Sequence, residues 1–163
     1  LGCKNVAFLR IGSSLDNEPN KRKAGFENGC LARNLQYTSK ILWDGDSLDE
    51  FEFFLTEHMH NGKLDFDGLF CGTDVVAYRI LKILKKLNVK VPDDVQVIGF
   101  DGIRNINESD YICSTIVQPV HDIAEMCVEL LLQENMASKP PLVCLPVSYL
   151  YGGTTKETPE KEE

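Results

Sequence analysis

The sequence predicts an α/β fold of three layers, in which a mainly parallel sheet lies between helices. Two observations support this prediction: short apolar segments alternate with longer amphipathic segments, and the amphipathic segments are long enough to carry the chain from one parallel strand to the next. Right-handed crossovers then place helices on both faces of the sheet. The chain has 163 residues, of which 43% are hydrophobic, and this fits one domain with a core of its own.

Strands are predicted where a short apolar or β-branched run is bounded by polar or turn-forming residues. The predicted strands cover residues 5–9, 38–43, 68–71, 95–100 and 115–117, and a further extended segment covers 143–151. Their shortness is typical of strands, and the helices between them imply βαβ units with parallel neighbours.

Helices are predicted for residues 20–33, 47–60, 74–87 and 119–132. The clearest is 74–87, because its apolar side chains recur every three or four residues and Asn88 can take the left-handed conformation that ends a helix. The stripe predicted to face the core consists of Val76, Ile80, Ile83 and Leu87. In the last helix, the predicted inward residues are Ile123, Met126, Leu130 and Leu131.

The helix at 47–60 begins with the sequence of a capping box, in which Ser47 and Glu50 each accept a backbone N–H. Asn61-Gly62 is predicted to end this helix, because both residues adopt the left-handed conformation readily. The side chains predicted to be buried are Leu48, Phe51 and Leu55.

Composition excludes several classes of function. A formal net charge of -8, from 17 basic and 25 acidic residues, argues against direct binding of a nucleic-acid backbone by this segment. No apolar run is long enough for a transmembrane helix, so no membrane partner is expected. The six cysteines lack the close spacing of zinc motifs and are predicted to be buried or half-buried thiols in a reducing cytosol. The chain begins at Leu1 like the middle of a larger protein, and residues 156–163 are predicted to be a disordered acidic tail.

Ligands of open parallel sheets bind beyond the carboxyl ends of the strands. This rule selects the loop up to Arg22, residues 44–47, the turn at 72–74, and Asp101. Their hydrogen-bonding groups suit a polyol. We identify no acid–base pair, nucleophile motif, phosphate loop or metal-ligand spacing, so we expect no catalytic residue, no metal, no cofactor and a protein that is not an enzyme.

Five motifs are similar to those of one known family and follow its order. They are RKAGF at 22–26, TDVVA at 73–77, VPDDVQVIGFD at 91–101, TIVQP at 115–119 and LPV at 145–147. Together they resemble the effector-binding core of the lac-repressor-like (LacI/GalR) transcription regulators. Each motif is weak alone, but all five lie in register over residues 1–155.

The resemblance implies a periplasmic-binding-protein-like type I fold, in which residues 1–155 form the carboxyl-terminal subdomain and 119–132 is a crossover helix that packs on a second subdomain. Segments that resemble the amino-terminal subdomain and the helix-turn-helix are absent from this sequence. The implied protein is a cytoplasmic homodimer that senses a sugar, polyol or purine effector and contacts DNA only through the absent upstream helix-turn-helix. An exported sugar-binding protein of an ABC transporter shares the fold and is the alternative.

The resemblance also implies roles for single residues. Arg22 matches an effector-clamping arginine, and Asp101 matches a carboxylate that accepts hydrogen bonds from the ligand. Thr73 lies where family members often carry Asn, and Ser47 lies near the position of an aromatic stacking residue. These four are the predicted ligand-binding residues, whereas Asp74 is expected to cap the following helix. Without the resemblance, the alternatives are a surface role for Arg22 and a turn role for Asp101. The prediction requires that Arg22 and Asp101 face one shared hollow.

Overall fold

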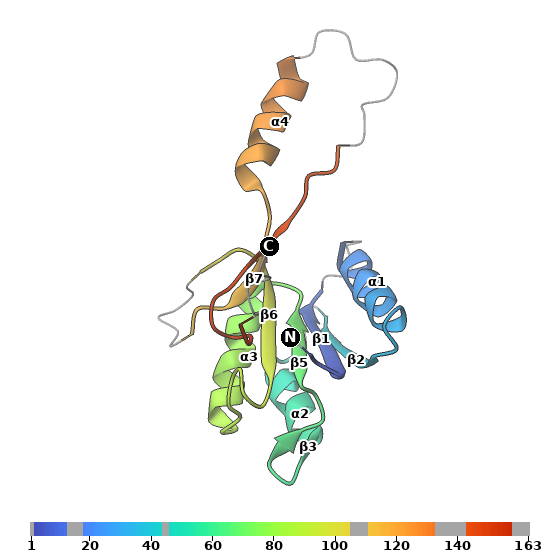
Figure 1. The fold of residues 1–163 in the computed structure, drawn as a ribbon, viewed down its shortest axis with the longest axis vertical. Coiled ribbons are helices and arrows are strands. Elements are labelled where there is room, and N and C mark those ends of the chain that lie inside the picture. The colour runs from blue at the N-terminus through green and yellow to red at the C-terminus, as the bar shows by residue number, and fades with distance from the viewer. Residues whose placement is uncertain (1, 13–17, 44–45, 105–110, 133–142, 158–163) are drawn as a thin grey trace, which may run out of the picture.

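The sheet is the centre of the computed structural model, which describes residues 2–12, 18–43, 46–104, 111–132 and 143–157 (Figure 1). Its strands, in spatial order, are β2 (Gln36–Leu42), β1 (Asn5–Ile11), β5 (Gly68–Cys71), β6 (Gln96–Asp101), β7 (Ser114–Val117) and β8 (Ser148–Leu150). The first five are parallel, and β8 is antiparallel to β7. The mainly parallel sheet is therefore confirmed, with one antiparallel strand at its edge.

Helices cover both faces of the sheet, because the side chains of a strand alternate between the two faces. In β1, Leu9 belongs to the core that contains residues of α2 (Glu50–Glu57) and α3 (Asp74–Lys86). The neighbouring Phe8 instead stacks on Phe26 of α1 (Glu18–Leu31), with 5.6 Å between the ring centroids. Helix α1 thus lies on the face opposite to α2 and α3, as the three-layer prediction requires (Figure 1).

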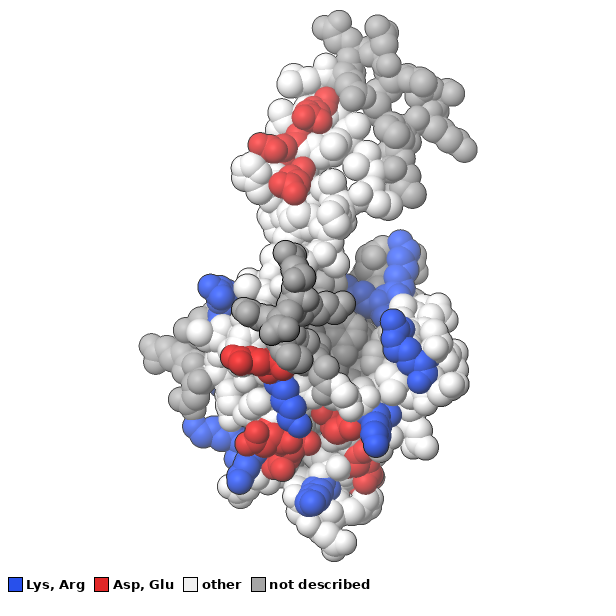
Figure 2. Space-filling model, viewed as in Figure 1, with Lys and Arg blue, Asp and Glu red and all other residues white. Residues whose placement is uncertain are grey.

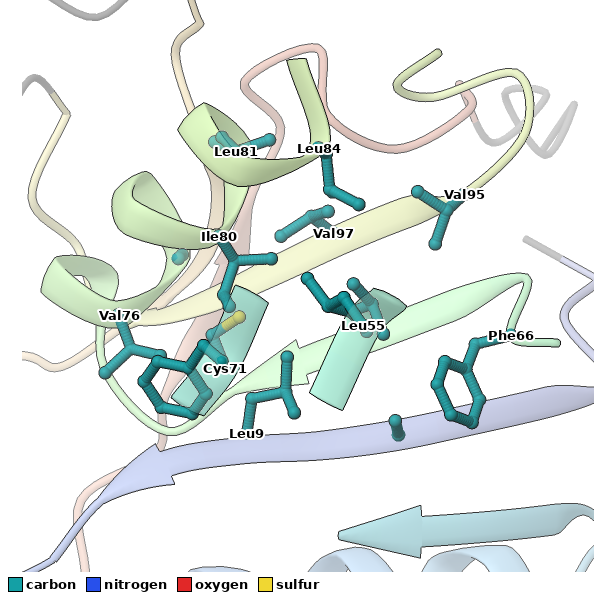
Figure 3. Close-up of a cluster of buried hydrophobic side chains, with 14 of the residues drawn as sticks. Leu9, Leu55, Phe66, Cys71, Val76, Ile80, Leu81, Leu84, Val95 and Val97 are labelled. Carbon is teal, nitrogen blue, oxygen red and sulfur yellow. The ribbon is translucent and has the colours of Figure 1, made fainter. Parts of the chain in front are cut away.

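The main core lies between α2, α3 and the sheet (Figure 3). Val76 and Ile80 are buried as predicted, but Ile83 and Leu87 are only partly buried, and Leu81 and Leu84 are buried in their place. The apolar stripe of α3 is therefore rotated toward Leu81 and Leu84. Asn88 has a φ of 57° just after the helix, which confirms the predicted left-handed stop.

The predicted helix at 47–60 is shorter at both ends. The predicted end at Asn61-Gly62 is wrong. These residues have φ values of 52° and 76°, the two positive angles of a type I′ hairpin turn. They join β3 (Met59–His60) to β4 (Lys63–Leu64) in a small antiparallel hairpin. Asn-Gly suits a helix end and a hairpin turn equally, and here the hairpin forms.

The capping box at the start of α2 is also absent. Asp49 occupies the N-cap without a side-chain capping bond, and the Ser47 hydroxyl accepts a hydrogen bond from the Asp49 N–H at 3.2 Å. The Ser47 hydroxyl thus bonds to a backbone N–H that precedes the helix, and not to an N–H of the first helical turn. Leu48 is consequently exposed, whereas Phe51 and Leu55 are buried as predicted.

Helix α4 (Val120–Leu132) extends away from the body, and residues 143–147 lead back toward it (Figure 1). No residue of α4 is buried by the described part of the chain, and Leu131 is 84% exposed. Acidic side chains lie along one side of α4, whereas basic and acidic side chains are mixed over the visible face of the body (Figure 2). Among the described helices, none combines the length and hydropathy that crossing a membrane requires.

The chain returns to the body beyond β8. The backbone N–H of Lys156 donates to Gln96 Oε1 at 2.9 Å, and Thr154 and Thr155 are buried. Residues 158–163, most of the predicted acidic tail, lie outside the described residues.

Candidate functional site

Arg22 extends from the first half of α1 toward the carboxyl ends of the central strands. Its Nη1 donates to the carbonyl oxygen of Gly72 at 2.6 Å, just after β5. Its guanidinium carbon lies 4.0 Å from the centroid of the Phe100 ring, near the end of β6. A cation over an aromatic face and a charge-assisted hydrogen bond both hold the guanidinium in place. Arg22 is therefore an ordered, half-buried residue of this edge and not a solvated surface residue.

Asp101 is the last residue of β6 and follows Phe100 directly. Its Oδ1 accepts a hydrogen bond from Gln118 Nε2 at 3.0 Å. Burial raises the pKa of the Asp101 carboxyl, and the positive charge of Arg22 and the bond from Gln118 oppose that rise. Arg22 and Asp101 therefore lie at one edge of the sheet, near enough for the charge of Arg22 to act on the Asp101 carboxyl. That both face one shared hollow stays a prediction.

The backbone of Asp101 has a φ of 125°, which side-chain-bearing residues rarely adopt. Such a conformation costs on the order of 1–3 kcal/mol and persists only where the surroundings hold it. The following Gly102 has a φ of 87°, which glycine tolerates. The carboxylate is thus presented from a strained turn.

Thr73, and not Asp74, caps the helix that follows. Thr73 is the N-cap of α3, and its hydroxyl accepts a bond from the Val76 N–H at 3.3 Å. Asp74 is fully buried and accepts bonds from Ile103 N–H and from the Thr115 hydroxyl, so the predicted cap at Asp74 is wrong. Thr73 lies next to Gly72, the partner of Arg22, and its ligand-binding role stays a prediction.

Ser47 follows the outer strand β2 and is exposed. Its hydrogen bonds are local, with the backbone N–H of Asp49 at 3.2 Å and the Asp49 carboxylate at 3.3 Å. No hydrogen bond among the described residues joins Ser47 to Arg22 or Asp101. The structure therefore brings Arg22, Thr73 and Asp101 together but leaves Ser47 apart from their contacts.

Gln118 and Phe100 are site residues that the sequence reasoning did not select. Gln118 follows the parallel strand β7, so the rule for carboxyl ends could have selected it. Both residues also line a pocket of about 370 Å³, together with residues of α4, and this volume suits a small ligand. The other lining residues are apolar or weakly polar: Pro119, Ile123, Met126, Cys127, Leu130, Val143, Leu145 and Val147.

A metal-like group of side chains lies on α4, apart from this edge. Ligand atoms of His121, Asp122 and Glu125 lie within 4.8 Å of one another, and all three residues are exposed. Exposed groups of this kind commonly pair without an ion, and His121 Nδ1 is 3.7 Å from the Glu125 carboxylate.

Comparison with known proteins places these observations in a family context. A model of the periplasmic binding protein-like domain matches residues 1–155. The chain is 34% identical over 152 residues to the sucrose operon repressor of Streptococcus mutans and 36% identical over 141 residues to the ribose operon repressor of Halalkalibacterium halodurans. These alignments cover 93% and 86% of the chain but only 46% and 41% of the two repressors. The chain thus spans less than half the length of either one.

A solved LacI family regulator from Lactobacillus casei with bound sucrose has a similar fold. It superposes with a TM-score of 0.70 at 20% sequence identity, over 94% of this chain and 57% of that chain. A likeness at this identity establishes the fold. It agrees with the predicted α/β architecture.

Proposed function

Because the chain belongs to the family of periplasmic binding protein-like domains and matches the effector-binding core of LacI/GalR regulators, we propose that it is the carboxyl-terminal part of the effector-sensing core of a transcriptional regulator. The observation that carries this proposal is the convergence of Arg22 and Asp101 at the carboxyl edge of the sheet. Effector binding shifts the core between open and closed states, and the shift changes affinity for operator DNA.

A sugar is the ligand class that the site supports best. Asp101 accepts hydrogen bonds from hydroxyl groups, and the guanidinium of Arg22 can donate to two adjacent hydroxyl oxygens. A polyol or a purine offers similar groups. The two relatives are named as repressors of sucrose and ribose operons, which favours a sugar and favours a regulator over an exported receptor of a transporter.

The rest of the ligand site belongs to a second subdomain in a longer protein. The exposed apolar side of α4 and the pocket beside it fit a helix that packs on that subdomain. DNA is bound through an upstream helix-turn-helix, since the acidic chain itself suits no phosphate backbone. The regulator acts as a cytoplasmic homodimer and carries out no catalysis.

A thermal-shift screen of the longer regulator tests this proposal. The panel contains sucrose, ribose, other sugars and polyols, and purine bases. A ligand at about one hundred times its Kd stabilises the folded state by about 2.7 kcal/mol, which raises the Tm measurably. We expect one class to do so, and we expect weak or no binding by the 163-residue chain alone. No shift with any panel member, or nanomolar affinity in the chain alone, would contradict the proposal.

A further inference from the structure

One buried carboxylate joins three segments of the fold directly beneath the candidate site. Asp74, in the first turn of α3, is 0% exposed. Its Oδ1 accepts from the Thr115 hydroxyl of β7 at 2.7 Å, and its Oδ2 accepts from the Ile103 N–H at 2.6 Å. Two donors therefore converge on one side chain. An ionised carboxylate suits them because both of its oxygens accept hydrogen bonds and neither donates.

Gly99 of β6 leaves room for the Asp74 carboxylate because it has no side chain. A Cβ atom on Gly99 of β6 would overlap Asp74 Oδ1, so only glycine fits beneath it. The close approach of α3 to β6 therefore depends on Gly99, and it places the Asp74 carboxylate within reach of the turn that follows β6.

The strained turn at Asp101 is held by the same bonds. The Thr115 hydroxyl oxygen accepts from the Gly102 N–H at 3.3 Å while its hydrogen goes to Asp74. The Ile103 N–H goes to Asp74 directly. Both amides after Asp101 are thus fixed to one buried pair.

One helical turn later, Tyr78 holds the next part of the same segment. Its hydroxyl bonds to the carbonyl oxygens of Ile103 and Arg104 and accepts from the Cys113 N–H at 3.2 Å. Burial raises the pKa of Tyr78, so the hydroxyl keeps its proton at physiological pH. Helix α3 therefore fixes backbone on both sides of residues 105–110, which lie outside the described residues.

We propose that Asp74 is a positioning residue of the ligand site, which acts with Thr115 to hold the Asp101–Gly102 turn so that the Asp101 carboxylate faces Gln118 and Arg22. This inference rests on the proposed function and adds the device that orients its carboxylate. Loss of either partner would leave Asp101 in the chain but release the strained turn, so the carboxylate would move toward solvent.

The test compares Thr115→Val with Thr115→Ser in the 163-residue chain, by amide hydrogen exchange and by a 13C NMR titration of the Asp101 carboxyl. We expect Thr115→Val to speed exchange at Gly102 by about tenfold or more and to lower the pKa of Asp101 toward its ordinary value. Thr115→Ser keeps the hydroxyl and should restore both. Thr56→Val, which removes an exposed hydroxyl of α2, should change neither.

Asp74→Asn provides the second variant, because it keeps the shape of the side chain but loses one acceptor. It should speed amide exchange at Gly102 or Ile103 and lower the pKa of Asp101, as expected for Thr115→Val. Unchanged exchange and an unchanged Asp101 titration in both Thr115→Val and Asp74→Asn would overturn the inference. The measurement needs no ligand, so this failure is separable from that of the proposed function, which is judged by the effect of Asp101→Ala on ligand affinity.

Discussion

Helices α3 and α4 are each 13 residues long, yet their surroundings differ completely. Helix α3 buries side chains along its length, including Ile80 and Leu84, between the sheet and α2. Helix α4 also carries apolar side chains, but none of its residues is buried in the described part of the chain. The spacing of apolar residues therefore predicts a helix and its apolar face. It does not predict which other segment packs on that face.

The proposed ligand site lies where these two regions meet. Asp101 ends strand β6, which packs against α3. Gln118, which donates a hydrogen bond to Asp101, lies just before α4 in the chain. A movement of α4 against the sheet would therefore reach Asp101 through one hydrogen bond. This geometry suits a sensor in which ligand binding and subdomain closure are coupled.

The largest expected effect is the loss of a core side chain from α3. Leu84→Ala should lower the free energy of unfolding by about 2–5 kcal/mol, because Leu84 is fully buried and truncation leaves a cavity. The matched change Leu131→Ala on α4 should stay within about 0.5 kcal/mol. Urea unfolding of both variants measures the difference, and equal losses would break the contrast between the two helices.

A smaller loss of stability is expected where β6 contacts the first turn of α3. Gly99→Ala should lower the free energy of unfolding by about 1–3 kcal/mol, because the new methyl group overlaps the Asp74 carboxylate. Gly29→Ala, in α1 with open space around the added atom, serves as the control and should raise stability by up to about 1 kcal/mol. If both variants gained stability, the close fit of Asp74 over Gly99 would be wrong.

The smallest effect is a pH dependence at the junction. Burial raises the pKa of Asp101, so the folded state holds this proton more tightly than the unfolded state. Its contribution is favourable at low pH and is lost as the pH rises from the ordinary to the raised pKa. Asp101→Asn cannot ionise and should be slightly more stable than the natural chain at neutral pH, with the two converging below the ordinary pKa.

Urea unfolding over a pH series measures this difference. The effect is small because Asp101 is only partly buried, and because Arg22 and Gln118 oppose the cost of burial. A natural chain that gained stability relative to Asp101→Asn over the same pH range would show that the Asp101 pKa is lowered and not raised.

The sequence predicts much of this architecture because periodicity and the rule for parallel sheets act locally. The rule for parallel sheets selected Asp101 and the loop up to Arg22, and the family resemblance assigned both residues a ligand role. The sequence could not distinguish the two uses of Asn61-Gly62, because the left-handed conformation serves a helix end and a type I′ turn alike. The sequence also did not show that Thr73 caps α3 in place of Asp74, because the donors that draw Asp74 inward come from Ile103 and Thr115, far along the chain.

Calorimetric titration of the longer regulator, with the ligand identified by the thermal-shift panel, tests the shared site of Arg22 and Asp101 most directly. Arg22→Ala and Asp101→Ala should each weaken binding by about tenfold to one hundredfold, since each removes a charged hydrogen-bonding group. Lys23→Ala, next to Arg22 but paired with Glu27 of the same helix at 2.8 Å, should bind normally. Unchanged affinity in the Arg22 and Asp101 variants would contradict the account.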